Sequence, residues 1–261
     1  MTLKTPMPAT FTFEQRGKIA IFTINRPQAM NSFTGEMLAA MDAGFAEFQR
    51  RNDLWVAILT GAGAKAFSAG MDLKEAIPQI TEGNEMGYDD HTKRPFSDVF
   101  KPIIAAVNGH CIAGGLEFML GTDIRIAAEH ATFGLGEVKV GIIPAGGSHV
   151  RIPRQIPWAV AMELLLMGRP ISAQRAHDVG LINAIVPADK LMETALEWAE
   201  TICKNGPLAV RTAKEIAVRA LALEPGFVLE KAIAPRVLNS EDAKEGPRAF
   251  LEKRAPNFKG K

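Results

Sequence analysis

The chain has 261 residues and a formal net charge of +1, with 47% hydrophobic and 23% charged residues. This composition is ordinary for a globular chain that is long enough to bury a substantial core, as one large domain or as a domain with an appendage. The near-zero charge excludes a long-range attraction to nucleic acid or to an anionic membrane.

The first residues, Met1 to Pro6, lack the charged segment and apolar stretch of a secretion signal. No apolar run approaches the ~20 residues that span a bilayer. The two cysteines, Cys111 and Cys203, make no disulfide framework, which favours a reducing compartment. We therefore expect a soluble cytoplasmic protein with no membrane or nucleic-acid partner.

Strands and helices alternate through the first two thirds of the chain. Short apolar runs predict strands at residues 18–25, 54–60, 103–107, 124–127 and 181–186. A helical apolar stripe follows Thr34, a short helix ends near Glu117, and residues 61–70 read as a glycine-rich loop. The alternation predicts an α/β fold whose parallel strands are buried on both faces.

Only helical patterns follow Pro187. They run from Asp189 to Glu252 and break at Gly206-Pro207, at Glu224-Pro225-Gly226 and at Asn239-Ser240, where stop and cap residues adjoin. A helical appendage of this kind packs on a neighbouring subunit or back on its own core. We therefore divide the chain into a core of residues 1–187 and a helical region of residues 188–261.

Two glutamates end runs of small and apolar residues. Glu117 ends the segment 108–117, and Glu137 follows the segment 133–136. Apolar surroundings raise the pKa of a carboxyl group. Two such groups in one cavity could share a proton and act as acid and base. The alternative is that both carboxylates face water.

Two glycine-bearing turns are candidates for contact with a ligand. In Ala69-Gly70-Met71-Asp72 and in Ala113-Gly114-Gly115, the backbone N–H groups can approach a ligand closely. Two such donors aimed at one carbonyl oxygen stabilise an oxyanion, each typically by ~100–1,000-fold in rate. The alternative is that these glycines only permit tight turns.

Other motifs are weaker. The segment Gly61-Ala-Gly-Ala-Lys-Ala66 fits a loose dinucleotide fingerprint, which requires a helix to begin at once. A nicotinamide-dependent oxidoreductase is therefore kept only as a rival hypothesis. In Gly146-Gly147-Ser148-His149 the adjacent side chains point apart and the nucleophile-elbow pattern is missing. The histidines show no metal-binding spacing, so we expect no metal.

The chain resembles the crotonase superfamily, and within it the enoyl-CoA hydratases. The matching segments are Asn25-Arg-Pro27 with Asn31, residues 66–73, 104–109, 114–117, 133–134 with Glu137, 141–144, 171–173 and 250–254. The resemblance implies a core of repeated ββα units and a helical C-terminal region that forms homotrimers, often paired as homohexamers. It also implies an acyl-CoA thioester as the substrate, of which coenzyme A is a part, and no separate cofactor.

By the same resemblance, the N–H groups of Met71 and Gly114 would hold the thioester oxygen. Glu117 would act as the base toward a water molecule, and Glu137 would deliver a proton to the α-carbon. Isomerases and many other relatives keep only one of these acids. The presence of both favours the reversible addition of water to a 2-enoyl-CoA, which gives a 3-hydroxyacyl-CoA.

The resemblance also assigns contacts to the coenzyme A part of the substrate. The adenine would lie near Ala69 and Leu73. Arg26, Lys74 and Lys253 match the positions of the basic residues that would meet the phosphates. They would do so through charge-assisted hydrogen bonds. Each of the three could equally be an ordinary surface charge.

Three departures from the family pattern leave alternatives open. Ala113 replaces the first of three glycines, Ala145 replaces a glycine near the catalytic water, and residues 78–100 match nothing specific. The acyl group is therefore not predicted. The alternatives are a 3,2-enoyl-CoA isomerase, another acyl-CoA lyase of the superfamily, such as a hydratase-lyase of aromatic acyl-CoAs, and a non-catalytic acyl-CoA-binding or scaffold protein.

Overall fold

The computed structural model describes residues 3, 6–81, 90 and 92–260. Its two sheets have the strand orders β1-β2-β3-β5-β7-β10 and β4-β6-β8-β9. The larger sheet consists of β1 (Phe11–Arg16), β2 (Ile19–Ile24), β3 (Val56–Gly61), β5 (Ile103–Val107), β7 (Ile124–Ala128) and β10 (Ala184–Val186). The smaller sheet consists of β4 (Ala66–Ser68), β6 (His110–Ile112), β8 (Thr132–Gly134) and β9 (Ile171–Ser172).

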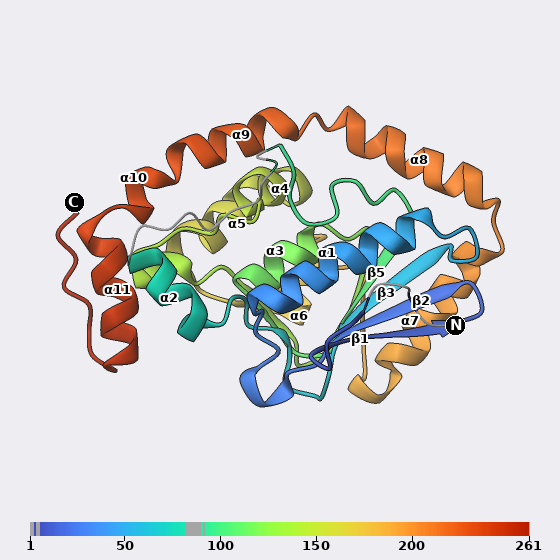
Figure 1. The fold of residues 1–261 in the computed structure, drawn as a ribbon, viewed down its shortest axis with the longest axis horizontal. Coiled ribbons are helices and arrows are strands. Elements are labelled where there is room, and N and C mark those ends of the chain that lie inside the picture. Colours follow the sequence, from blue (N-terminus) through green and yellow to red (C-terminus); the bar gives the residue numbers. More distant parts are fainter. Residues whose placement is uncertain (1–2, 4–5, 82–89, 91, 261) are drawn as a thin grey trace.

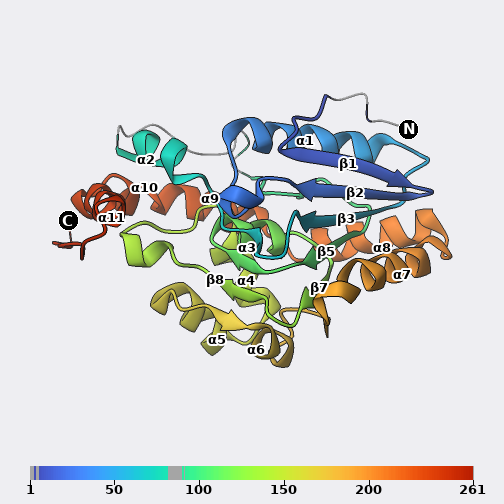
Figure 2. The same ribbon diagram turned by 90° about the horizontal axis from the view of Figure 1, so that it is seen from below.

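The larger sheet is parallel except at one edge. β1 and β2 pair antiparallel, and each following pair, from β2–β3 to β7–β10, is parallel. Figure 2 shows β1, β2, β3, β5 and β7 in this order across the molecule. In the smaller sheet β4, β6 and β8 are parallel, and β9 is antiparallel to β8.

The central strands are buried on both faces, as predicted. In β3, Ala57 and Leu59 belong to an apolar cluster that includes α1 (Gly35–Arg50), and Phe22 stacks on Phe45 there at 4.4 Å between ring centroids. Val56 and Ile58 belong to a second cluster, which includes α7 (Leu191–Cys203). Alternate strand residues point to opposite faces, so one strand supplies both clusters.

The two sheets are built from a repeated unit. A strand of the larger sheet is followed by a strand of the smaller sheet and then by a helix: β3, β4 and α2 (Leu73–Thr81), then β5, β6 and α3 (Gly114–Leu120). A third unit has β7, β8 and the short 3₁₀ helix η2 (Glu137–Val140). The remaining short elements among the described residues are η1 (Pro27–Ala29), α4 (Ser148–Gln155), α5 (Trp158–Met162), η3 (Glu163–Met167), α6 (Ala173–Asp178) and η4 (Ala188–Lys190).

The C-terminal helices form an arc along one side of the molecule (Figure 1). They are α8 (Pro207–Ala220), α9 (Glu224–Ile233), α10 (Pro235–Leu238) and α11 (Glu241–Leu251). The breaks before α8, α9 and α11 fall at or beside the predicted positions, whereas the break at Ala234, before α10, was not predicted. At the end of the arc, α11 contacts α2 and η2. The contact is intimate, because a Cβ atom on Gly246 of α11 would lie 1.9 Å from the carbonyl oxygen of Val140.

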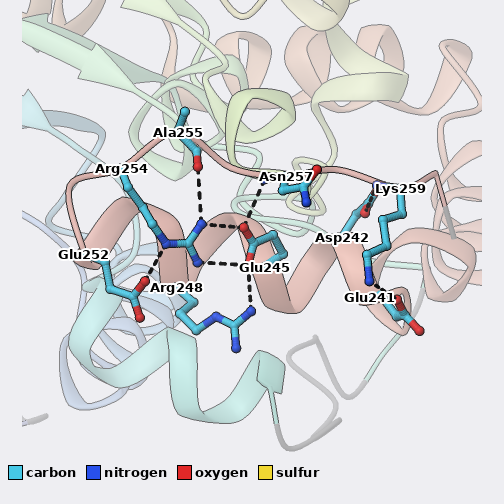
Figure 3. Close-up of polar contacts among 9 residues, drawn as sticks. All are labelled: Glu241, Asp242, Glu245, Arg248, Glu252, Arg254, Ala255, Asn257 and Lys259. Atoms are coloured by element: carbon cyan, nitrogen blue, oxygen red, sulfur yellow. Dashed lines mark hydrogen bonds and ion pairs between the residues drawn. The ribbon is translucent and has the colours of Figure 1, made fainter.

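The last residues turn back along α11 (Figure 3). Glu245 accepts two hydrogen bonds from Arg254, at 2.6 and 3.0 Å, one from Arg248 at 2.7 Å and one from the amide of Asn257 at 3.0 Å. Asp242 accepts from the amide of Lys259 at 2.7 Å. We call these contacts, between Glu245 and Asp242 of α11 and the residues after Lys253, the C-terminal clasp.

Some sequence-based expectations were wrong in detail. The expected loop at 61–70 contains β4, and the expected strand at 181–186 begins only at Ala184. Just before it, the side chain of Asn183 accepts a hydrogen bond from the amide of Arg125 at 2.8 Å. The start of the expected irregular segment 78–100 continues α2 to Thr81, and its residues 82–89 and 91 lie outside the described residues. Within the described part of the chain, none of the helices has the length and apolarity to cross a membrane.

Candidate active site

The repeated unit brings the predicted site residues together. Met71 follows β4, Gly114 follows β6 and Glu137 follows β8, and these three strands are parallel neighbours in the smaller sheet. The carboxyl ends of parallel strands lie at one edge of a sheet, where ligands of α/β proteins commonly bind. Residues far apart in the sequence therefore meet at this edge.

Two backbone amides face the same space. Phe33 pairs with Met71 as a parallel bridge, in which the amide of Phe33 donates to Gly70 O and the amide of Asp72 donates to Phe33 O, both at 2.8 Å. This pairing leaves the amide of Met71 directed to the opposite side. The amide of Gly114 begins α3 and has no intrahelical acceptor.

The close approach of these amides depends on Gly70. A Cβ atom there would lie 2.8 Å from the amide nitrogen of Gly114 and 2.9 Å from Cβ of Ala113. Gly70 also has a φ of +88°, which favours glycine. A Cβ atom built on Gly114 would lie 3.7 Å from the amide nitrogen of Met71, so the two donors are neighbours. Such a pair has the form of an oxyanion hole.

Glu117 stands in the first turn of the same helix that Gly114 begins. Positions three apart share a helix face, and side chains lean toward the amino end, so its carboxylate lies on the Gly114 side. Its Oε1 accepts hydrogen bonds from the amide of Gly146 at 2.7 Å, the hydroxyl of Ser148 at 2.9 Å and the amide of Ser148 at 3.4 Å. Its Oε2 accepts none from the described residues.

Glu137 is buried and less well satisfied. It begins η2, it is 9% exposed, and its Oε2 has no hydrogen-bond partner among the described residues. Burial, and then the negative charge of Glu117, raise the pKa of Glu137 to about 8.

The pair has unequal environments. Burial raises the pKa of Glu117 too, but the bonds from Ser148 and Gly146 act in the opposite direction. Hydrogen bonds donated to a carboxylate favour its charged form. Three donors reach Glu117, whereas Oε2 of Glu137 has no partner among the described residues, so hydrogen bonding favours the charged form at Glu117 more than at Glu137.

The residues assigned to coenzyme A have different surroundings. The Arg26 guanidinium donates to Asp72 at 2.9 Å and to the Ser32 carbonyl at 2.9 Å, so it also braces the segment that carries Met71. Lys74 is exposed. Ala69 and Leu73 are half-buried beside Met71. The last of the set, Lys253, is exposed and follows α11, whose contacts with α2 and η2 bring that helix to the site.

The hydrogen bonds that the turn before α4 donates to Glu117 were not predicted from the sequence. Ser148, which the sequence pattern excluded as a nucleophile, is a hydrogen-bond donor to this glutamate. Ala145 was expected near the catalytic water, whereas the amide that bonds to Glu117 belongs to the neighbouring Gly146. A Cβ atom on Gly146 would lie 2.6 Å from Oε2 of Glu117, so a larger residue there would displace this carboxylate. The glycine-rich run before α4 was the available signal.

The dinucleotide fingerprint fails on structure. After Gly61, the chain enters strand β4 at Ala66, and no helix begins there to face a pyrophosphate. The loop is instead tied by Asn31, whose side chain donates to Ala62 O at 2.9 Å and to Ala66 O at 2.6 Å. Across the described ranges, we find no cluster of three or more His, Cys, Asp or Glu side chains arranged to hold a metal.

Comparison with known proteins agrees with this geometry. A family model described as enoyl-CoA hydratase/isomerase matches residues 14–261. Enoyl-CoA hydratase EchA19 of Mycobacterium tuberculosis is 43% identical over 257 residues, which cover 95% of this chain and 96% of the relative. (E)-benzylidenesuccinyl-CoA hydratase of Thauera aromatica is 41% identical over 253 residues, which cover 95% of this chain and 98% of the relative.

The fold is shared as well. A crystal structure of carnitinyl-CoA hydratase from Mycobacterium avium superimposes with a TM-score of 0.88 at 40% identity, over 98% of this chain and 100% of that chain. The α/β fold predicted from the resemblance, with its crotonase-like ββα units and C-terminal helices, is therefore confirmed. The chain belongs to the enoyl-CoA hydratase/isomerase family.

Proposed function

We propose that this protein is an enoyl-CoA hydratase that adds water reversibly to a 2-enoyl-CoA and gives a 3-hydroxyacyl-CoA. The carrying observation is the pair of buried carboxyl groups, Glu117 and Glu137, at the edge of the smaller sheet that also carries the neighbouring amides of Met71 and Gly114. A proton-holding acid and a charged base at one oxyanion hole are the parts that hydration of a conjugated thioester needs.

In the proposed reaction, the thioester oxygen lies between the amides of Met71 and Gly114. Oε2 of Glu117 accepts a proton from water while the water oxygen bonds to the β-carbon. The π-electron pair moves toward the α-carbon and the thioester oxygen, whose developing charge the two amides stabilise. Glu137, whose pKa is about 8, then delivers its proton to the α-carbon.

No redox cofactor or metal takes part in this proposal, because the amides and the two acids supply every proton and charge that the reaction moves. Coenzyme A enters as part of the substrate. We propose that Lys74, Lys253 and Arg26 meet its phosphates and that the adenine lies against the backbone near Ala69 and Leu73. The exposed ammonium groups of the two lysines support this assignment.

We propose further that the protein forms a homotrimer, or a homohexamer of two trimers. Large apolar side chains are exposed on the outer helices: Leu208, Ile216, Val228, Leu229 and Ile233 are each more than 40% exposed. Several large apolar side chains exposed on neighbouring helices are typical of an interaction site. Light scattering after size exclusion tests the mass, and a monomer would reject this part. The cytoplasmic location stays a prediction from the sequence.

The test of the activity mixes purified protein with crotonyl-CoA and with longer, branched and aromatic enoyl-CoAs. Hydration removes the absorbance of the conjugated thioester, and mass spectrometry identifies the 3-hydroxyacyl product. Folded protein that hydrates none of these substrates would reject the proposal. Tight binding of acyl-CoA without turnover would favour the binding-protein alternative.

A further inference from the structure

A buried ion cluster lies behind the turn that holds Glu117. Arg94 and Glu230 are each 3% exposed at the side chain, and their ion pair measures 3.0 Å. The Arg94 guanidinium also donates to Phe227 O at 3.2 Å and to Lys93 O at 2.6 Å, and it lies over the Phe227 ring at 5.1 Å. The other oxygen of Glu230 accepts from Nδ1 of His149 at 3.1 Å.

The cluster touches the holding turn directly. His149 is the residue after Ser148, at the start of α4. Gly147, in the middle of the turn, has a φ of +101°, and a Cβ atom there would lie 2.9 Å from Cγ of Arg94 and 3.1 Å from the Phe227 ring. Gly226 of α9 packs closely on α4 as well, because a Cβ atom built on Gly226 would lie 2.8 Å from Cγ1 of Val150.

The geometry points to a positioning role. We propose that Glu230, through Arg94 and His149, fixes the turn 146–148 on Oε1 of Glu117 and so makes α9 part of the active-site framework. This proposal rests on the proposed role of Glu117 as the base. Glu230 touches no reacting atom and acts only through the turn.

Charge supports the arrangement. The negative charge of Glu230 reaches Glu117 and raises its pKa, as burial does more strongly. Arg94 and His149 face Glu230 directly, and Arg151, which donates to Pro95 O at 2.7 Å and lies 5.5 Å from the Phe227 ring, is the next cation of α4. Removing the charge of Glu230 while keeping its shape should therefore change both the placement and the titration of Glu117.

The principal variant is Glu230→Gln, with His149→Ala as a second variant that leaves the Arg94–Glu230 pair in place. We expect kcat on the best enoyl-CoA to fall about ten- to a hundredfold in E230Q, with KM changed less than threefold, because small misplacements of a catalytic group are costly. The acidic limb of the kcat/KM profile should move, because loss of the Glu230 charge lowers the pKa of Glu117 and loosening of the turn raises it. H149A should lose about three- to tenfold in kcat.

The matched control is Lys214→Met on α8. It removes another ion pair of the C-terminal region, a half-buried one with Asp123 at 2.7 Å. K214M should keep its kcat within about twofold and its acidic limb, since within the described part of the chain no hydrogen bond or ion pair joins Lys214 or Asp123 to the turn. Wild-type kcat and pH profile in folded E230Q, or an equal loss in K214M, would overturn the proposal.

A measurement of stability, which needs no catalytic turnover, tests the positioning role of Glu230 separately from the hydratase activity. If the wild-type protein hydrates no enoyl-CoA, the proposed function fails, and a double-variant cycle of E117Q and E230Q by thermal unfolding still tests the coupling. The Tm change of the double variant should differ from the sum of the single changes by about 2 °C or more. Additive changes would overturn the positioning role.

Discussion

The hydroxyl of Ser148 donates a 2.9 Å hydrogen bond to Oε1 of Glu117 across 31 positions of sequence. Together with the amide of Gly146, it leaves Oε2 of the same carboxylate as the oxygen open to a reactant. The turn before α4 thus occupies one carboxylate oxygen of the glutamate on α3 and leaves the other without a hydrogen bond from the described residues. The first prediction follows from this bond.

Ser148→Ala removes the hydroxyl and keeps the amide. Because the hydroxyl lowers the pKa of Glu117, its loss should raise that pKa and move the acidic limb of kcat/KM to higher pH. We expect kcat at neutral pH to fall about tenfold, as for the loss of one hydrogen bond to a charged group. Ser172→Ala, on β9 at the cap of α6, is the control. An unchanged limb in S148A would contradict the assigned bond.

Replacing each acid separately distinguishes hydration from isomerisation. We expect both Glu117→Gln and Glu137→Gln to lower kcat for hydration by about 10²–10⁴-fold, since each removes one proton-transfer group. A 3,2-enoyl-CoA isomerase would tolerate one of the two replacements. The measurement is product formation from 2-enoyl-CoA and from 3-enoyl-CoA, with folding checked by circular dichroism.

The state of Glu137 predicts how stability depends on pH. Its pKa in the folded protein, about 8, is above the ordinary value of 4.5, so the folded state binds the proton more tightly than the unfolded state. The protonated Glu137 therefore contributes to the free energy of unfolding of the wild-type protein at low pH. This contribution decreases as the pH rises from about 5 through 8 and changes no further above that range. Glu137→Gln carries no such charge.

We expect the Tm of E137Q minus that of the wild type to increase between pH 5 and pH 9 at constant ionic strength. Glu215→Gln, which removes one carboxylate of the exposed ion pair with Arg219 on α8, serves as the comparison variant. The same titration predicts that hydration slows as the pH passes about 8, where Glu137 loses the proton that it delivers. A Tm difference that stays flat or decreases in E137Q would show that Glu137 is ionised at neutral pH.

Ala113 is in a backbone conformation that suits glycine, with φ +54° and ψ −129° at the start of α3. Such conformations typically cost a non-glycine residue about 1–3 kcal/mol. Ala113→Gly should therefore raise the free energy of unfolding by about 1 kcal/mol. Ala213→Gly, in the exposed middle of α8, should lower it by about 1 kcal/mol. Denaturant titration measures both, and changes of equal sign would contradict the strain at Ala113.

The sequence predicted the long elements well because their apolar periodicity is local. It did not reveal β4, β6 and β8, which have three residues each and no periodicity to detect. Those short strands determine where Met71, Gly114 and Glu137 meet, so the residues alone gave the two glutamates and the two glycine-bearing turns as candidates, and the family resemblance joined them in one site. The contacts that hold it are long-range: Gly146 meets Glu117 across 29 positions, and Arg26 meets Asp72 across 46. No local pattern encodes such pairs.

The C-terminal clasp gives a prediction about the end of the chain. Glu245 accepts hydrogen bonds from Arg254, Arg248 and the amide of Asn257 (Figure 3). The aromatic ring of Phe258 would lie 2.9 Å from a Cβ atom built on Gly141, which follows η2. Glu245→Ala removes the acceptor shared by these donors. The residues after Lys253 should then detach more often from α11 and η2.

Limited trypsin digestion of the native protein measures this detachment, because Lys253, Arg254 and Lys259 are cleavage sites. Cleavage after these residues should be about tenfold faster in E245A than in the wild type, since proteolysis follows the population of the open form. Glu215→Ala, which removes the exposed pair with Arg219 on α8, is the control and should cleave at the wild-type rate. Equal rates in E245A and the wild type would mean that the tail is held by Phe258 and Asp242 without Glu245.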